Sequence, residues 1–302
     1  MKMESVRWHV RMALVGIVTA AAIIPVGAVA QEARAPANTP VPAPDLKPGK
    51  WTGRRLADGQ PDVEGFYSNT QGNHGSFTRP GRSRVTDPAD GQVPFQPWAA
   101  AKVQEFRANF NNPSAPQFIE PLARCAPGGV PKSFFWHGHE IRQYPGYVVI
   151  LFGSGTRIIH LDGKPHLPAG IKLWNADSRG HWEGNTLVVD VTNNNSKALF
   201  GRSGEFASEN VHIEERWIFD ADAKRYNVKA LFTDPEVYTR PWTATIPMNR
   251  RTLETDKPDN WHFIVNVANH PGKSPYVESI ETVCTENNGG FGFGATSYPS
   301  GN

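Results

Sequence analysis

The residues of this chain best suited to acid–base chemistry are a histidine, a carboxylate and a guanidinium that alternate along one predicted strand. Successive side chains of a strand point to opposite faces, so residues 211–219 carry His212, Glu214 and Arg216 on one face. A histidine beside a carboxylate and a guanidinium can give or take a proton near neutral pH. Two charged residues of other predicted strands, Asp190 and Arg240, complete the set of candidate catalytic residues.

The sequence leaves two placements of this charged face open. It is either a solvated outer surface or the lining of a polar cavity, as in barrels that enclose one small ligand. The opposite face is apolar apart from Glu215, whose buried carboxylate would need a cationic partner such as Arg157 or Arg240. Asp190 is similarly flanked by valines. Several charges that converge in one sheet favour a polar pocket.

Aromatic and histidine residues supply two further candidate sites. Four rings could hold a flat or sugar-like ligand, with core positions as the alternative: Trp174, Trp182, Tyr238 and Trp242. His137 and His139 lie on the same side of a predicted strand, which can present two ligands to zinc or copper, with His160 or His166 to complete the set. The spacing fixes no third ligand, so we expect neither a metal nor another cofactor.

The elements that must position these residues are mostly β-hairpins. The clearest joins residues 178–182 to residues 186–191 through a tight turn in which Gly184 is expected to take a positive φ. The predicted strands are 134–144, 147–152, 156–161, 178–182, 186–191, 211–219, 225–232, 240–246 and 277–284. Short links should make sequential strands antiparallel neighbours, and apolar spacing predicts one helix over 95–110. The expected fold is mainly β, an antiparallel barrel or calycin-like sandwich with one N-terminal helix and long irregular arms.

Residues 1–30 have the form of a secretory signal peptide. Basic residues precede an apolar run, and Ala28 and Ala30 suit signal peptidase, so cleavage after Ala30 is expected. A Pro/Ala-rich linker should follow over 31–50, then a single β domain over 51–286 and a flexible tail over 287–302. We expect a periplasmic or secreted protein with no membrane span after signal cleavage.

Export also bears on the two cysteines of the chain. Disulfide bonds form in oxidising compartments, so Cys125 and Cys284 are expected to be linked, with two buried free thiols as the alternative.

The charge of the chain bears on its partners. The whole sequence has a net charge of +2, and the predicted signal holds three Lys/Arg against one Glu, so the mature chain is near neutrality. Basic and acidic residues are interspersed, whereas a nucleic-acid-binding protein normally shows a basic excess or stripe. We therefore expect a small-molecule ligand or substrate and no nucleic acid, and the sequence does not indicate an oligomeric state.

Six runs within residues 122–287 are similar to those of a known protein family. They are RC at 124–125, YVVIL at 147–151, DSRGHWEGNTLVV at 177–189, HIEER at 212–216, YTRPWT at 238–243 and CTEN at 284–287. On these runs the chain resembles a large family of exported bacterial β-rich proteins of unassigned function. It has Asn185 where the family often has Asp, and Thr285 where the family often has His. The resemblance implies export, a β fold and one domain, and it assigns no catalytic residue.

Together these features favour an exported enzyme with a polar β-barrel cavity. It would act as a lyase or hydrolase, using acid–base chemistry for elimination, hydration or hydrolysis of a small organic molecule. The alternatives are a non-catalytic periplasmic carrier or sensor of a small apolar or aromatic ligand, and an interaction module without a pocket. A wet cavity lined by His, Glu and Arg would favour the enzyme, and a dry one lined by Trp and Val the carrier.

Overall fold

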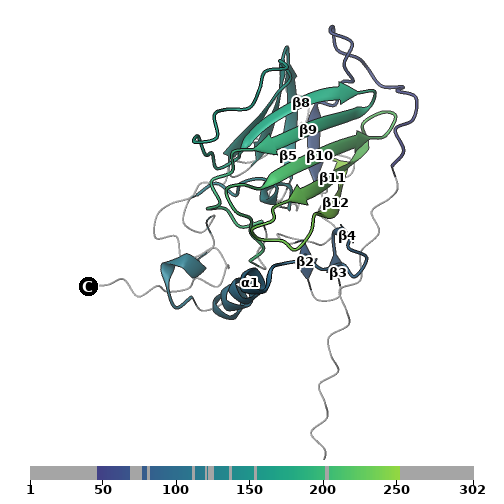
Figure 1. Ribbon diagram of the computed structural model, residues 1–302. Helices are drawn as coiled ribbons and strands as arrows, with labels where there is room; N and C mark the ends of the chain where they lie inside the picture. The colour runs from purple at the N-terminus through teal and green to yellow at the C-terminus, as the bar shows by residue number, and fades with distance from the viewer. Residues whose placement is uncertain are drawn as a thin grey trace, which may run out of the picture. The chain divides into compact units, whose positions relative to one another are not determined.

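Nine strands of the protein close into a barrel. The computed structural model describes residues 46–68, 77–79, 82–110, 113–119, 121, 126–135, 138–152, 155–200 and 204–251 (Figure 1). Around the barrel the strands are β1 (Gly65–Ser68), β5 (His139–Tyr144), β6 (Tyr147–Phe152), β7 (Gly155–His160), β8 (Asp177–Glu183), β9 (Thr186–Thr192), β10 (His212–Phe219), β11 (Arg225–Thr233) and β12 (Trp242–Arg250). β1 pairs with both β5 and β12, which closes the ring. The predicted mainly β barrel is confirmed.

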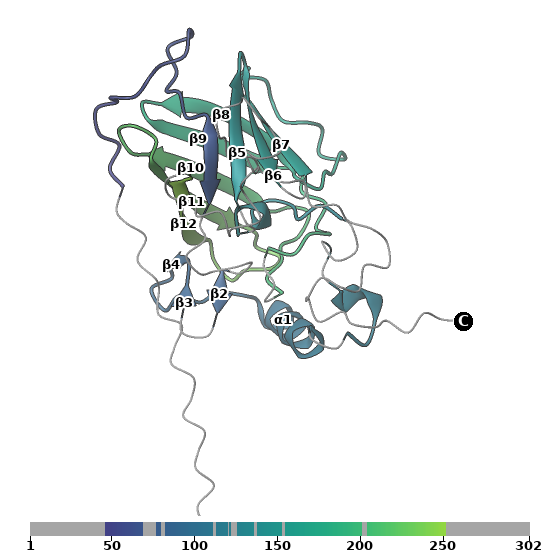
Figure 2. The same ribbon diagram turned by 180° about the vertical axis from the view of Figure 1, so that it is seen from behind.

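Short elements flank the barrel. β4 (Val85–Asp87) pairs with β12 on the side away from β11, and β2 (Thr78–Arg79) with β3 (Arg82–Ser83) forms a small separate ribbon. Figure 2 shows β1 and β5 to β7 from behind, on the side of the barrel opposite to β8–β10. The sequence predicts an extended arm and a loop where β1 and β4 lie. Strands of four and three residues are too short to show an alternating pattern.

Neighbouring strands β7 and β8 run parallel, although the other barrel pairs are antiparallel. The expectation that sequential strands are antiparallel is wrong at this position. Residues 161–176 form a long connection here, and only such a connection lets two parallel strands lie side by side. This connection matters below, because it carries His166 over the outer face of the barrel.

The hairpin of β8 and β9 forms as the sequence predicts. Asp177 pairs with Thr192, and the register continues to Glu183 opposite Thr186. Gly184 begins the two-residue turn with a φ of 61°, a backbone conformation that costs other L-residues about 1–2 kcal/mol.

Gly184→Ala should therefore lower the free energy of unfolding by about 1–2 kcal/mol. A Cβ at Gly184 would meet no heavy atom within 4 Å, so backbone strain is the whole cost. Gly170→Ala is the matched control, because a Cβ there also meets nothing and its φ is not positive. Urea denaturation followed by tryptophan fluorescence measures both variants, and equal effects would contradict the strained turn.

The interior of the barrel is filled by aromatic side chains. Trp217 stacks on Tyr226 with 5.6 Å between ring centroids, and Phe219 stacks on Tyr226 at 4.7 Å. Phe134 meets Trp217 edge-on at 5.1 Å. Phe134 belongs to a 3-10 helix, Lys132–Phe135, where the sequence predicts the start of a strand. These buried rings make the described interior a packed core.

The predicted helix is confirmed as α1 (Pro97–Asn109), which lies below the barrel beside β2 (Figure 1). Proline suits its first turn, where the missing N–H has no partner to lose. Ala99, Val103 and Phe106 are buried, whereas Trp98 is 53% exposed and donates a hydrogen bond to the carbonyl of Glu236.

Several predictions fall outside the described residues. They concern the signal peptide at 1–30, the tail at 287–302, the strand at 277–284, His137, and the cysteines Cys125 and Cys284. Among the residues that are described, no helix has both the length and the apolar character needed to cross a bilayer.

Candidate functional site

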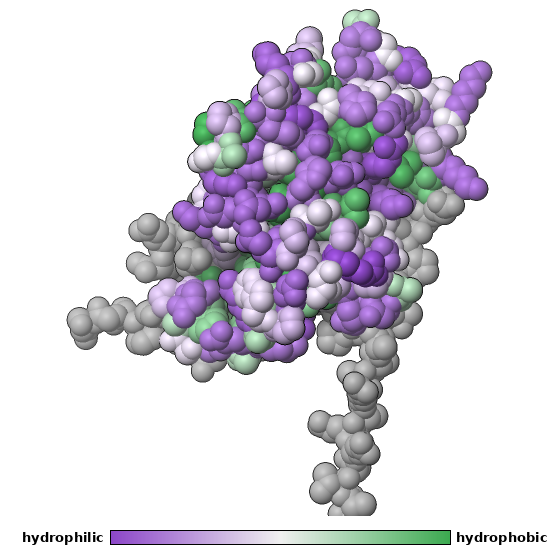
Figure 3. All heavy atoms as spheres, in the orientation of Figure 1, coloured by the Kyte–Doolittle hydropathy of each residue, from purple (hydrophilic) through white to green (hydrophobic). Residues whose placement is uncertain are grey.

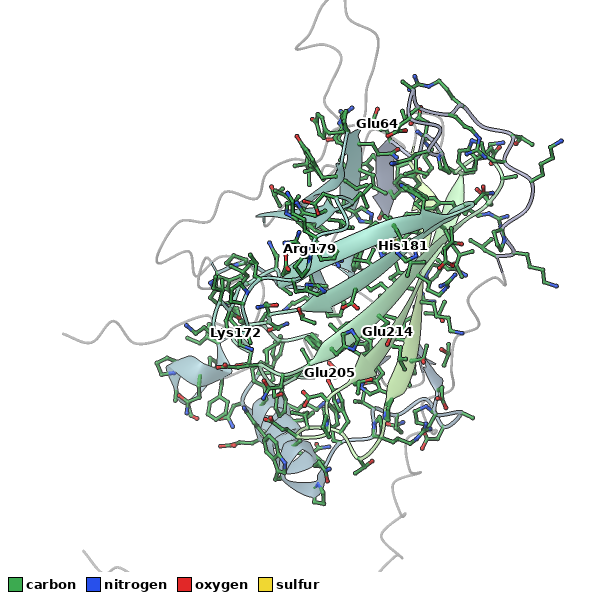
Figure 4. The ribbon with its side chains drawn as sticks, turned by 45° about the horizontal axis from the view of Figure 1, so that its top comes forward. Glu64, Lys172, Arg179, His181, Glu205 and Glu214 are labelled. Atoms are coloured by element: carbon green, nitrogen blue, oxygen red, sulfur yellow. The ribbon has the colours of Figure 1, made fainter. Side chains whose placement is uncertain are left out.

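The charged face of β10 lies on the outside of the barrel. His212 is partly exposed and Glu214 and Arg216 are exposed, whereas the alternate residues 213, 215, 217 and 219 point inward and are buried. Figure 4 shows Glu214 of β10 with Arg179 and His181 of β8 on this outer side, and Figure 3 shows the same side as mostly hydrophilic. The predicted alternation is confirmed. The prediction that the charged face lines a barrel cavity is wrong, because the apolar face fills the interior.

Two of the candidate catalytic residues meet on this outer face. In the pairing of β9 with β10, Asp190 lies opposite Glu214, which is two residues from His212 and on the same face of β10. The imidazole Nε2 of His212 lies 2.9 Å from the carboxylate Oδ1 of Asp190. The other ring nitrogen, Nδ1, is 4.0 Å from Glu214 Oε1. The side chains of His212 and Asp190 are 38% and 50% exposed, so a small molecule can reach them from solvent.

A second histidine, His166, approaches the same carboxylate oxygen. Its Nε2 lies 3.1 Å from Asp190 Oδ1, and its Nδ1 lies 2.7 Å from Asp177 Oδ2. His166, Asp177, Asp190 and His212 thus form a continuous chain of alternating imidazoles and carboxylates, which we call the outer-face site. The carboxylate of Asp190 is its centre, because it contacts both imidazoles.

The geometry constrains the protons of the outer-face site. Both ring nitrogens of His166 face carboxylate oxygens, and a carboxylate can only accept. Both contacts can therefore be hydrogen bonds at the same time only when both ring nitrogens of His166 carry a proton. His212 needs a proton only on Nε2 to bond Asp190, which leaves Nδ1 able to accept a proton from another molecule.

Asp177 holds His166 in place. Its buried Oδ2 also accepts hydrogen bonds from the backbone N–H of Leu167 at 3.1 Å and from Nε of Arg179 at 3.2 Å. Burial by itself raises the pKa of the Asp177 carboxyl, but the hydrogen bonds from Leu167, Arg179 and His166 together lower this pKa below its usual value. Asp177 is therefore an ionised anchor for the ring of His166.

The connection that carries His166 is fixed to the barrel by Asn193. The amide nitrogen of Asn193 donates to the carbonyls of Pro168 at 3.0 Å and Ile171 at 2.8 Å. The backbone of Leu173 donates in turn to the Asn193 carbonyl at 2.8 Å. These bonds give residues 166–173 a defined position over β8 and β9.

The two candidate arginines lie apart from the Asp190–His212 pair. Arg216 donates to Oε2 of Glu183 at 2.5 Å, so its guanidinium faces the turn end of β8. Arg240 binds both carboxylate oxygens of Asp87, at 3.1 and 3.2 Å, beside β4. The prediction that Arg240 joins His212 is therefore wrong, because Arg240 lies next to β12 and its charge is paired with Asp87 of β4.

Most of the four predicted ligand-binding rings belong to the core. Trp242 and Tyr238 are buried, and Trp242 stacks on Phe232 with 4.1 Å between centroids. Trp182 packs against Phe219 at 6.0 Å, and Trp174 is half-buried at the end of the long connection. The structure does not bring these rings together into one exposed platform, which agrees with the alternative of core positions.

A second polar group is enclosed in the barrel. Arg157 contacts Oε1 of Glu215 at 3.2 Å and Oε2 at 3.0 Å, and its Nε donates to the hydroxyl of Ser178 at 3.0 Å. The indole of Trp217 also donates to Glu215, at 2.9 Å. Of the two predicted partners of Glu215, Arg157 is thus confirmed. These side chains are at most 1% exposed, so the group holds the barrel together rather than meeting a ligand.

The position of His139 does not suit the candidate metal-binding pair of His137 and His139. His139 is fully buried and points inward, where its Nε2 meets the hydroxyl of Tyr226. Burial, with a smaller contribution from Arg157, lowers the His139 pKa to about 3. Across the described part of the chain, no three His, Cys, Asp or Glu side chains are arranged to hold a metal ion.

The roles of His166 and Asp177 were missed by sequence reasoning. His166 lies in a connection of irregular sequence, where the pattern suggests only a possible metal ligand, and Asp177 lies just before the predicted strand 178–182. One local signal existed, because Asp177 opens the most specific run of the family resemblance. No protein-family model, curated protein or solved structure matches the chain, so its own geometry is the basis for the function proposed next.

Proposed function

We propose that the protein is an exported enzyme that performs acid–base chemistry on a small organic molecule at the outer-face site. The observation that carries the proposal is the pair of imidazoles, His212 and His166, on one oxygen of Asp190 at 2.9 and 3.1 Å. An exposed imidazole oriented by a carboxylate is a common general base or acid. The signal-like residues 1–30 support a periplasmic or secreted location.

The roles of the residues follow from their contacts. Asp190 accepts the Nε2–H of His212 and so fixes the tautomer in which Nδ1 carries a lone pair. In hydrolysis, Nδ1 of His212 would take a proton from a water molecule while the oxygen of that water attacks the substrate. The resulting imidazolium would then return the proton to the oxygen of the leaving group. The Nε2 of His166 contacts the same oxygen of Asp190 and helps to hold that carboxylate beside His212. Elimination and hydration use the same proton transfers at a carbon and an oxygen.

A screen for turnover by the purified mature protein tests this proposal. Small esters, lactones, hydroxy acids and unsaturated acids are incubated with it, and products are followed by NMR. We expect turnover of at least one class, and a loss of about 10²–10⁴-fold in kcat/KM for both His212→Ala and Asp190→Asn.

His181→Ala is the matched control. His181 is an exposed histidine of the outer face that contacts Glu183 at 3.2 Å and takes no part in the outer-face site. The free energy of unfolding of all three variants should lie within about 0.5 kcal/mol of the wild-type value, as is usual for exposed substitutions. Turnover that survives in His212→Ala and Asp190→Asn would place the chemistry elsewhere.

The alternative is a non-catalytic carrier or sensor that holds a small apolar or aromatic ligand inside the barrel. The packed rings of Trp217, Phe219 and Tyr226 occupy that space, so the described interior supports this alternative less well than the open site supports catalysis. Retention of an organic ligand by the purified protein, seen by native mass spectrometry, together with no turnover of any substrate class, would favour the carrier.

A further inference from the structure

Another exposed carboxylate, that of Glu214, lies next to the outer-face site. Glu214 is two residues from His212 on the same face of β10, and its side chain is 58% exposed. Its Oε1 lies 4.0 Å from Nδ1 of His212, which is too long for a direct hydrogen bond. Two polar atoms at this separation suit a bridge through one small molecule.

The bridging molecule must donate to both atoms. Nε2 of His212 bonds Asp190 at 2.9 Å, which leaves a lone pair on Nδ1, and the carboxylate oxygen of Glu214 can only accept. A water molecule has two O–H donors, and its oxygen can lie about 2.8 Å from each of two such acceptors. An alcohol has one O–H donor and cannot bridge them. Water held in this way turns the lone pairs of its oxygen away from both residues, towards a substrate.

Strand β11 provides the surface beside this position. In the pairing of β10 with β11, Thr233 lies directly opposite His212, and Leu231 lies directly opposite Glu214. Directly opposite side chains on one face of a sheet lie about 5 Å apart at Cβ. Thr233 and Leu231 are half-buried on the outer face. The hydroxyl of Thr233 can donate to a carbonyl oxygen, and Leu231 offers an apolar contact to the body of a substrate.

We infer that Glu214 positions the attacking water on His212, so that the site hydrolyses small carboxylic esters or lactones. The inference rests on the function proposed above and selects hydrolysis from its three reactions. Nδ1 of His212 takes one proton of the water while the water oxygen forms a bond to the carbonyl carbon. The bond from that carbon to the leaving oxygen then breaks, and the imidazolium returns the proton to this oxygen. One ester and one water give one acid and one alcohol.

A crystal structure of the mature protein at near-atomic resolution tests the position of the water without any substrate. One ordered water should lie within hydrogen-bonding distance of both Nδ1 of His212 and Oε1 of Glu214, and it should be missing in Glu214→Ala. Glu214→Gln keeps a side-chain oxygen that accepts, and should keep the water. A wild-type structure without this water overturns the inference, whatever the turnover.

The acetate ester of 3-hydroxybutanoate tests the reaction, because it can react by two routes. Hydrolysis gives acetate and 3-hydroxybutanoate, whereas elimination gives acetate and crotonate, and NMR separates these products. We expect the products of hydrolysis. Crotonate as the product, or turnover of hydroxy acids or unsaturated acids alone, overturns the inference and leaves the proposed acid–base function standing. No turnover of any substrate class overturns the proposed function, and this inference with it.

Two substitutions of Glu214 separate positioning of the water from binding of the ester. Glu214→Ala should lower kcat by about 10- to 100-fold with little change in KM, because the water is no longer held in line with the carbonyl carbon. Glu214→Gln should recover part of this loss, since its amide oxygen still accepts. Thr233→Val removes the donor to the carbonyl oxygen and should lower kcat/KM by about tenfold or more.

Glu183→Ala is the matched control. Glu183 is a 48% exposed glutamate of the same outer face that pairs with Arg216, and its removal should leave kcat and KM unchanged. A melting curve close to that of the wild type confirms that each variant is folded. Equal losses of kcat in Glu214→Ala and Glu183→Ala, or a loss in Glu214→Ala that appears only in KM, would overturn the role of Glu214 as the residue that positions the water.

Discussion

Arg157→Met should lower the free energy of unfolding by about 3–5 kcal/mol, because it leaves a buried carboxylate without its cation. Arg157 and Glu215 are 1% and 0% exposed and are joined by two nitrogen–oxygen contacts of 3.2 and 3.0 Å. Methionine keeps most of the volume of the side chain, so the loss measures the unpaired charge rather than a cavity. Urea denaturation followed by tryptophan fluorescence gives the value.

Two variants make this measurement specific. Arg142→Met removes an arginine whose side chain is 48% exposed and paired with Glu140 on the outer face of β5, and should cost less than about 1 kcal/mol. The double variant Arg157→Met/Glu215→Leu should recover part of the lost stability, since replacing a whole buried pair by apolar residues is often neutral, although the indole N–H of Trp217 loses its acceptor. Similar costs for Arg157→Met and Arg142→Met would show that the pair is not sequestered from water.

This ion pair also shows what the sequence could predict. Glu215 alternates with Ile213 and Trp217, so its burial and its need for a cation follow from the pattern of one strand. The choice of Arg157 over Arg240 depends on where β7 lies in the ring of strands. β7 joins β8 in parallel through the connection 161–176, and no local pattern predicts that pairing.

The same distinction applies to the outer-face site. Alternation placed His212 and Asp190 on strands, and the structure shows them in contact because β9 and β10 are neighbours in register. His166 comes from the long connection, whose path is set by the hydrogen bonds of Asn193, and irregular segments carry no period to read. Alternation separates the two faces of β10 but does not say which face points inward. The large side chains of Trp217 and Phe219 fill the interior, so the charged face lies outside.

His139 should make the folded protein less stable as the pH is lowered below about 6.5, by about 1.4 kcal/mol per pH unit. His139 is fully buried between Phe134, Phe152 and Trp217, and burial together with Arg157 lowers its pKa to about 3. The folded protein therefore keeps His139 neutral, whereas the unfolded chain takes up a proton on this imidazole near pH 6.5.

The sign of the effect follows from the proton balance. Between about pH 6.5 and pH 3 the unfolded state holds one more proton on this imidazole than the folded state, so His139 favours unfolding in acid over this whole window. Buried Glu205, whose pKa is raised by burial, has the opposite effect in the acidic part of the window, and it is the same in the wild type and in a His139 variant. The contribution of His139 is fully present above pH 6.5 and is lost progressively as the pH falls towards 3. Asp177 and Asp87, whose carboxyl pKa values are lowered, add their own loss of stability only at more acidic pH.

His139→Gln separates the histidine from these carboxylates. Glutamine does not titrate, and it can still bond the hydroxyl of Tyr226, the present partner of His139 Nε2. In urea unfolding at pH 7, 6 and 5, the wild type should lose about 2 kcal/mol more stability between pH 7 and pH 5 than His139→Gln. His181→Gln, at an exposed outer-face residue, should keep the wild-type slope. Equal slopes in the wild type and His139→Gln would mean that His139 takes up its proton inside the folded barrel, and the buried contact with Tyr226 would then have to open to water below pH 6.5.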